Sequence, residues 1–200
     1  MRYSADHKAQ TRARIVKEAA ARFRKDGIGA TGLQPLMKGL GLTHGGFYAH
    51  FKSKDDLVET ALGSAVEEMN TLVSEKFAQE HPLEKFIDLY LSDTHRMHPE
   101  RGCPLATMGA ELGQRGQPSA AVDAAAQRRL QLMAAALGGG AAADEQSLVM
   151  LSTMIGALVL SRSVVDEAFA ERVLEASRAA LKGQAQAAAD IPKKPESPCA

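Results

Sequence analysis

The stretch that most constrains this chain is residues 33–51, LQPLMKGLGLTHGGFYAHF. Its first half carries apolar residues at spacings of three and four, namely Leu33, Leu36, Met37 and Leu40. That spacing predicts a short helix with one apolar face. Gly41 can adopt the left-handed conformation that ends a helix in a sharp turn, and Thr43 can cap a second helix over residues 44–50. The stretch therefore predicts two short helices joined by a tight turn.

The second helix carries residues suited to meeting DNA. In a helix-turn-helix this helix enters the major groove and turns its N-terminal side chains toward base edges. Phe47 and Phe51 are four residues apart and can pack inward, which leaves Tyr48 and His50 facing outward. Gly45 and Gly46 allow the backbone to approach DNA closely but weaken the helix. By itself the pattern also fits an ordinary helical hairpin in an all-helical domain.

The run from residue 27 to 58 resembles the DNA-binding segment of the TetR family of bacterial repressors. The family pattern has a glycine after the first helix, a threonine before the second, a Gly-apolar-Ser/Thr turn, a glycine in the recognition helix, an aromatic-Tyr-x-His/Tyr-Phe close and a following lysine. The matching residues are Gly27, Thr31, Gly41, Leu42, Thr43, Gly45, Phe47, Tyr48, His50, Phe51 and Lys54. The sequence departs from the pattern at Gly32, Pro35 and Gly39, which bears on the rigidity of the second helix. The resemblance implies an all-α fold that binds DNA.

Charge is distributed unevenly along a chain of zero net charge. Residues 1–58 hold 11 Lys and Arg against 5 Asp and Glu, whereas residues 59–200 hold 13 against 19. A basic first quarter on an acidic remainder indicates a nucleic-acid-binding module joined to a different one. Much of the basic surface of a first helix over residues 7–26 is expected to be solvated, with Lys8 and Arg12 as phosphate contacts by analogy with the family.

Two further residues flank the hairpin at positions suited to phosphate. Thr31 is expected to cap the second helix and to reach a phosphate with its hydroxyl. Lys54 follows the cap residue Ser53, where a cation opposes the helix dipole unless a phosphate lies nearby. The predicted DNA-contacting residues are Thr31, Thr43, His44, Gly45, Tyr48, His50, Lys52 and Lys54.

The rest of the chain is predicted to be helical. We expect a long helix from residue 54 to about 80 and further helices at about 82–97, 104–113, 118–138, 143–165 and 167–182, about nine in all. The predicted domains are residues 1–53 for DNA binding, 54–183 for regulation and dimerisation, and a disordered tail at 184–200.

Residues 143–165 are apolar nearly all round, which predicts a helix buried on every side. With residues 167–182 they resemble the helix pair that forms the dimer interface of TetR-like proteins. Two recognition helices related by a twofold axis read a palindrome, so we expect a homodimer. The longest apolar run, residues 148–160, is shorter than the roughly 20 residues of a membrane span, and no signal peptide is recognisable, so we expect a cytoplasmic protein without membrane contact.

A ligand pocket is expected in the regulatory domain, since methionine and aromatic side chains suit adaptable apolar sites. The candidate lining residues are Phe86, Tyr90, Met108, Met133 and Met154, together with Met69 and Met150. Packing in an ordinary core is the alternative for each of them.

Cys103 is the most distinctive residue of this region. Pro104 suits a first helical position, which makes Cys103 an N-cap whose thiolate the helix dipole and Arg101 would favour. The Gly-Cys-Pro-Leu segment at residues 102–105 also resembles a TetR-family branch that includes electrophile-responsive repressors. The alternatives are a small buried hydrophobe, or a metal ligand with His95 and His98. The two cysteines, Cys103 and Cys199, fit a reducing compartment.

These features predict a sequence-specific DNA-binding regulator, a repressor released from a palindromic operator by a small-molecule or electrophile effector. We expect no enzyme activity, no cofactor and no bound metal. The alternatives are a cysteine-dependent enzyme, with Cys103 as nucleophile and His95 or His98 as base, and a non-regulatory helical adaptor. No Gly-rich phosphate loop or nucleophile-elbow motif supports the enzyme.

Overall fold

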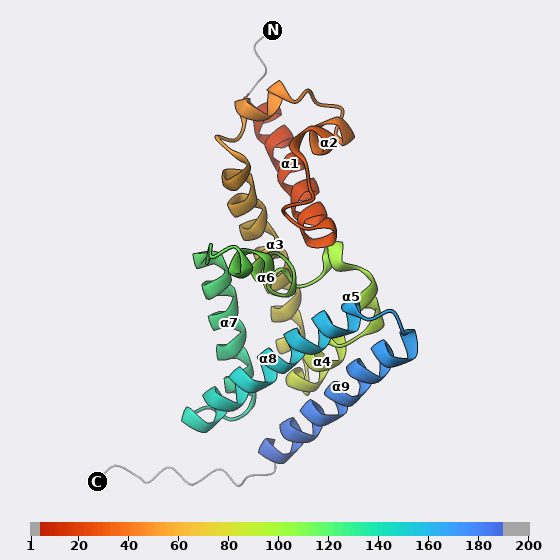
Figure 1. Cartoon of the computed structure of the whole chain (residues 1–200). Helices are drawn as coiled ribbons and strands as arrows, with labels where there is room; N and C mark the ends of the chain where they lie inside the picture. The colour runs from red at the N-terminus through yellow and green to blue at the C-terminus, as the bar shows by residue number, and fades with distance from the viewer. Residues whose placement is uncertain (1–4, 190–200) are drawn as a thin grey trace, which may run out of the picture. The chain divides into compact units, whose positions relative to one another are not determined.

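The computed structural model describes residues 5–189, and every regular element within them is helical. The α-helices are α1 (Ala5–Asp26), α2 (Leu33–Gly39), α3 (Lys54–Phe77), α4 (Pro82–Tyr90), α5 (Asp93–Met97), α6 (Met108–Gln114), α7 (Ala120–Ala136), α8 (Ala141–Ser163) and α9 (Glu167–Ala189). Three short 3-10 helices complete this range, η1 (Gly45–Ala49), η2 (Pro99–Arg101) and η3 (Pro104–Ala106). The predicted all-α class is confirmed, with nine α-helices in the described range (Figure 1).

The chain divides into two compact units that alternate along the sequence. The first comprises Met1–Glu75 and Asp93–Gln127, and the second comprises Lys76–Ser92 and Arg128–Ala200. Helix α3 belongs to the first unit as far as Glu75, and α7 passes from the first unit to the second after Gln127. The predicted functional domains are continuous segments that end at residues 53 and 183, and these boundaries stay predictions. Of the expected tail, residues 184–189 extend α9, and residues 190–200 lie outside the described residues.

The first unit is built on α1. Its apolar stripe is buried, as the spacing of three and four residues predicts. The buried α1 residues are Ile15, Val16, Ala19, Ala20 and Phe23. Residues of α2, of η1, of the segment after η1 and of the start of α3 complete this small core, namely Leu36, Met37, Phe47, Phe51, Leu57 and Val58. The core holds the helix-turn-helix segment against α1, which suits a segment that must present a fixed outer face.

The second unit contains the pair α8 and α9, which lie side by side (Figure 1). One face of α8 is buried, including Met150, Met154 and Leu158, whereas Val149 on another face is 58% exposed. The prediction of a helix buried on every side is therefore wrong for the single chain. Some of the apolar side chains of α8 are exposed instead.

Helix α8 is long and apolar enough to cross a membrane by length and composition alone. The prediction from the shorter run of residues 148–160 underestimated it, because the helix extends beyond that run at both ends. The helix nevertheless packs against α9 and α4. Ser147 and Ser161 are fully buried on it, each donating its hydroxyl to a carbonyl of the same helix. One face of α8 thus packs within a helical bundle, while 39% of its most apolar window is buried.

Candidate DNA-binding site

The turn between α2 and η1 has the predicted form. The carbonyl of Met37 accepts hydrogen bonds from the backbone N–H groups of Leu40 at 3.1 Å and Leu42 at 2.9 Å. Gly41 lies in the left-handed region with φ of 71°. A residue with a Cβ is disfavoured in that conformation, so glycine fits here and the chain can reverse sharply.

The second helix of the motif is shorter and tighter than predicted. It is the 3-10 helix η1, Gly45–Ala49, and not an α-helix over residues 44–50. Gly45 and Gly46 explain the difference, because each lowers α-helix propensity by about 1 kcal/mol. The N-cap of η1 is His44 and not the predicted Thr43. Thr43 lies one residue earlier, and its Oγ1 accepts a hydrogen bond of 3.2 Å from the backbone N–H of Gly46, so it still holds the first turn.

The aromatic residues of η1 separate into an inner and an outer set. Phe47 is fully buried and stacks on Phe51 with ring centroids 5.5 Å apart. Tyr48 is 62% exposed and meets the edges of the Phe47 and His44 rings at 5.2 and 6.0 Å. No atom lies within 4 Å of a Cβ built on Gly45. The outer surface of η1 is thus open, with Tyr48 and His44 projecting from it.

His50 was expected to face outward but is half-buried. Its Nδ1 atom is buried and makes no hydrogen bond within the described part of the chain. It borders a hollow of about 480 Å³ beside the N-terminal part of α1, lined also by His7, Lys8, Thr11 and Thr43. Burial lowers the pKa of His50 from 6.5, and the positive charges of Lys8 and Arg12 lower it further. The ring is therefore neutral near pH 7 and borders a basic hollow.

Thr31 has a different role from the predicted one. Its side chain is buried, and its hydroxyl donates a 2.7 Å hydrogen bond to the carbonyl of Gly27. The N-cap of α2 is Gly32, which has no side chain to cap with. The expectation that Thr31 caps α2 is wrong, because its hydroxyl bonds the carbonyl of Gly27 at the start of the loop between α1 and α2 instead. Contact of Thr31 with a phosphate stays a prediction.

Ser53 caps the start of α3, as the sequence indicates. Its Oγ accepts a hydrogen bond of 3.1 Å from the backbone N–H of Asp56, and the Asp56 carboxylate accepts one of 2.8 Å from the backbone N–H of Lys52. These bonds fix the backbone on both sides of Ser53. The Lys52 side chain is exposed and that of Lys54 is half-buried at the first residue of α3.

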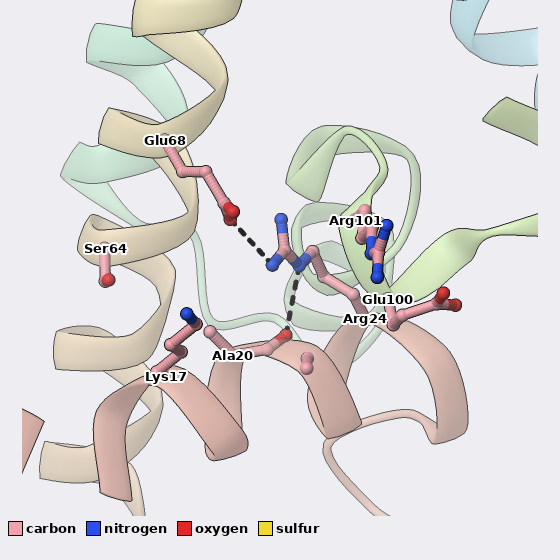
Figure 2. A pocket seen from close by; sticks show the side chains of 8 residues that line it. Lys17, Ala20, Arg24, Ser64, Glu68, Glu100 and Arg101 are labelled. Atoms are coloured by element: carbon pink, nitrogen blue, oxygen red, sulfur yellow. Dashed lines mark hydrogen bonds and ion pairs between the residues drawn. The ribbon is translucent and has the colours of Figure 1, made fainter. Parts of the chain in front are cut away.

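Arg24 is a residue whose role the sequence pattern did not show. It belongs to the first helix, whose basic residues are expected to be largely solvated, yet only 5% of it is exposed. Its guanidinium donates to the Ala20 carbonyl at 3.1 Å and to the Glu68 carboxylate at 2.9 Å (Figure 2). It also donates to the Gly102 carbonyl at 3.3 Å. Its spacing could have indicated this burial, since Arg24 follows the buried residues Val16 and Ala20 at intervals of four and so lies on the same helix face.

Glu111 of α6 was also missed. Its carboxylate accepts hydrogen bonds from the backbone N–H groups of Ile28 at 2.6 Å and Gly29 at 2.8 Å, and it pairs with Arg115 one turn along α6. Arg24 and Glu111 together join the DNA-binding segment to the later part of the first unit. No local pattern foretells contacts between residues more than 80 positions apart.

Cys103 is fully buried in the first unit. It occupies the predicted N-cap position, but the helix that follows is the three-residue η3 and no side-chain cap bond forms. Its backbone N–H donates to His95 Nε2 at 2.9 Å, and His98 Nδ1 lies 3.2 Å from Glu100 Oε1. Among the described residues no group of three His, Cys, Asp or Glu side chains is placed to hold a metal ion, so these three do not form a metal site.

The remaining effector candidates are buried in both units. In the second unit the rings of Phe86 and Tyr90 meet edge-on with centroids 5.8 Å apart, and Met133 and Met154 are fully buried. Met108 is fully buried in the first unit. Burial suits either a ligand pocket or an ordinary core, so the lining role of all five stays a prediction.

The fold and this site define a class, an all-α helix-turn-helix DNA-binding regulator. Residues 15–61 match the family model described as bacterial regulatory proteins, tetR family. This match covers the DNA-binding segment, and the chain as a whole shares the fold of solved TetR-family regulators. No curated protein sequence matches the chain significantly.

Solved structures of TetR-family regulators share the fold. One from Chloroflexus aurantiacus has a TM-score of 0.75 and 23% identity, with 90% of this chain and 96% of that chain covered. Another, from Streptomyces coelicolor, has a TM-score of 0.75 and 21% identity, with 91% and 97% covered. The reduced form of Escherichia coli NemR has a TM-score of 0.70 and 19% identity, with 87% and 96% covered.

Proposed function

We propose that this chain is a transcriptional repressor that binds a palindromic operator as a homodimer and is released by an effector. The observation that carries the proposal is the helix-turn-helix itself: the Gly41 turn presents an open η1 surface with Tyr48 exposed. An exposed aromatic side chain on a glycine-rich backbone suits close contact with DNA.

The DNA face combines base-reading and backbone-binding groups. Thr43, His44 and Tyr48 are exposed on or beside η1, and Lys52 is exposed before α3. With Gly45 and Gly46 in the recognition helix, few side chains remain for base edges, so those three carry most of the direct contact. Lys52 and Lys54 supply charge for phosphates, which makes binding weaken steeply as salt concentration rises.

The exposed apolar surface of α8 supports the homodimer. Leu148, Val149, Val159 and Leu160 are all more than a third exposed on this one helix, and Phe169 is exposed on α9. Several exposed apolar side chains on one pair of helices suit a protein interface. Two copies joined through α8 and α9 would place two recognition helices on successive major grooves of a palindrome.

We propose that the effector is a small apolar or aromatic molecule. The candidates Phe86, Tyr90, Met133 and Met154 offer aromatic and thioether surface within the second unit. A structural relative with 17% identity and a TM-score of 0.51, RolR, was solved in complex with resorcinol, which is a small aromatic ligand. An electrophile that modifies Cys103 is the alternative effector, and it requires local opening because the thiol is fully buried.

A DNA-binding regulator acts where the chromosome is, so we infer a cytoplasmic location. The proposed role also includes no catalysis. The His95 Nε2 atom, the candidate general base, already accepts the backbone N–H of Cys103. That bond occupies the lone pair which would have to take a proton from the thiol.

The test is operator binding by fluorescence anisotropy. We expect the protein to prefer the DNA upstream of its own gene over a scrambled duplex of equal composition. We expect Tyr48→Ala and Lys54→Ala each to weaken binding by about tenfold, which corresponds to about 1.4 kcal/mol. Lys85→Ala, which changes an exposed lysine of α4, is the control and should bind like the wild type. Equal affinity for both duplexes would overturn the proposal.

A further inference from the structure

A second hollow lies within the first unit, away from η1. It has a volume of about 660 Å³ and lies between α1, α3 and η2. The lining residues are Lys17, Ala20, Ala21, Arg24, Ser64, Glu68, Glu100 and Arg101. The small side chains of Ala20 and Ala21 leave the space open on the α1 side, and charged groups from all three elements surround it (Figure 2).

The carboxylates around the hollow are already bonded. Glu68 accepts the hydrogen bond of Arg24 at 2.9 Å. Glu100 interacts with His98 Nδ1 at 3.2 Å, and its carboxylate turns away from Arg24 and Lys17 (Figure 2). A hydrogen bond with its own backbone N–H, followed by the His98 contact, lowers the pKa of Glu100 below 4.5, so that it stays ionised.

The cations of the hollow, by contrast, are not all compensated. Neither Lys17 nor Arg101 has a side-chain hydrogen bond or ion pair with another residue in the described range, and both are exposed. One charge of each sign cancels in the Arg24–Glu68 pair. The remaining groups give the hollow a surplus of positive charge and of N–H donors.

Arg24 gives the hollow a rigid donor. Its guanidinium is fixed by acceptors from α1, α3 and the residue after η2, which use three of its five N–H groups. Ser64, on α3, carries a hydroxyl that makes no hydrogen bond with the residues described. Donors whose positions are set before a ligand arrives lose little entropy on binding it.

We propose that this hollow binds the phosphate group of a small molecule, at a site separate from the effector pocket of the second unit. A phosphate presents oxygens in several directions, so it can accept from a lysine, an arginine and a hydroxyl on different helices at once. A single carboxylate has fewer oxygens to offer. The volume exceeds that of free phosphate, which leaves room for the organic part of a phosphate ester.

Such a ligand would connect elements that are distant in sequence. Lys17 and Arg24 lie on α1, Ser64 on α3 and Arg101 at the end of η2. A phosphate held between them would fasten the helix that supports the DNA-binding segment to α3 and η2. The site would thereby give the regulator a second input beside its effector.

The test is a titration of ¹⁵N-labelled protein, without DNA, at constant ionic strength. The probes are inorganic phosphate and glycerol 2-phosphate, which distinguish free phosphate from a phosphate ester. We expect saturable shifts of the amide signals of Ala20, Ala21 and Ser64. We expect the double variant Lys17→Gln/Arg101→Gln to bind at least about tenfold more weakly, since both charged donors to the phosphate are removed.

The matched control is Lys85→Gln/Arg172→Gln, which removes the same charges from exposed positions of α4 and α9. It should bind both probes like the wild type. Three results would overturn the proposal: shifts that do not saturate, equal loss of binding in the control, or shifts confined to the amides of Thr43 and Lys54 on the DNA face. Because no DNA is present, failure of the proposed operator binding would not affect the outcome.

Discussion

Glu111 holds the loop after α1 by accepting the backbone N–H of Ile28 at 2.6 Å, and its second oxygen accepts that of Gly29 at 2.8 Å. The preceding Gly27 has a φ of 91°, which turns the two amides toward the same carboxylate. A Cβ at Gly29 would lie 2.8 Å from the end of the Arg115 side chain, which would have to shift to make room. The loop leads directly into α2, and Glu111 therefore ties the DNA-binding segment to α6.

We predict that Glu111→Ala lowers the free energy of unfolding by about 1–3 kcal/mol, because two backbone N–H groups lose their acceptor. Urea denaturation followed by circular dichroism measures the change. Glu175→Ala, at an exposed position of α9, is the control and should change stability by less than about 0.5 kcal/mol. An equal effect of the two substitutions would show that Glu111 is only a surface residue.

The three bonds of Arg24 give a second prediction. Arg24→Lys keeps the positive charge but removes the planar fork that serves Ala20, Gly102 and Glu68 together. We expect a loss of about 1–3 kcal/mol in unfolding free energy, since a lysine cannot satisfy all three acceptors. Arg172→Lys on α9 is the control. A thermal or urea transition unchanged from the wild type would contradict the role assigned to the guanidinium.

The local geometry of the DNA-binding segment was predictable from the sequence. Gly41, Thr43 and the Phe47–Phe51 pair each act over a few residues, and the structure places them as their spacing indicates. The difference at η1 is also local. The sequence predicts an α-helix over residues 44–50, but Gly45 and Gly46 lower α-helix propensity and the backbone forms a 3-10 helix instead.

Longer-range features could not be predicted in the same way. The bond from Ile28 to Glu111 spans 83 positions, and no periodicity shows which glutamate will meet which amide. Thr31 had two possible partners, the start of α2 and the carbonyl of Gly27, and only the folded loop shows that the carbonyl is used. An apolar helix face has the same sequence pattern whether the same chain or a second copy covers it. The sequence of α8 therefore could not show which of its faces is buried within the single chain.

The proposed phosphate contact of Lys54 predicts a change in salt dependence. Each lysine that neutralises a phosphate contributes about 0.9 to the slope of log K against log salt concentration. We expect Lys54→Gln to reduce that slope by about one for operator and non-specific DNA alike, measured by anisotropy between 50 and 200 mM salt. Lys85→Gln should leave it unchanged. An unchanged slope for Lys54→Gln would make this residue a solvated lysine.

The exposed α8 surface predicts how the proposed homodimer is broken. Val149 is 58% exposed, and we expect Val149→Glu to weaken dimerisation by at least about tenfold, because a carboxylate would have to be buried in the interface. Sedimentation equilibrium measures the constant. Met97→Glu changes an equally exposed apolar residue on α5 and should leave the dimer intact. A dimer that persists in Val149→Glu would exclude this part of α8 from the interface.

The lowered pKa of His50 predicts that operator affinity rises as the pH falls. In free protein, burial and the charges of Lys8 and Arg12 hold this pKa below 6.5. Phosphates bound beside Lys8 and Arg12 would offset those charges, so the pKa is higher in the complex and binding takes up protons. The linkage gives at most about a tenfold gain per pH unit for one proton, and it operates between the two pKa values.

Folding stability responds with the opposite sign. The unfolded chain, with a His50 pKa of 6.5, protonates before the folded one, so stability is lost as the pH falls below that value. The affinity should therefore be measured by anisotropy between pH 7.5 and 5.5 while circular dichroism confirms folding. We expect His50→Gln to lose this part of the pH dependence and His81→Asn, before α4, to retain it. If His50→Gln gained affinity on acidification as the wild type does, the response would belong to another group.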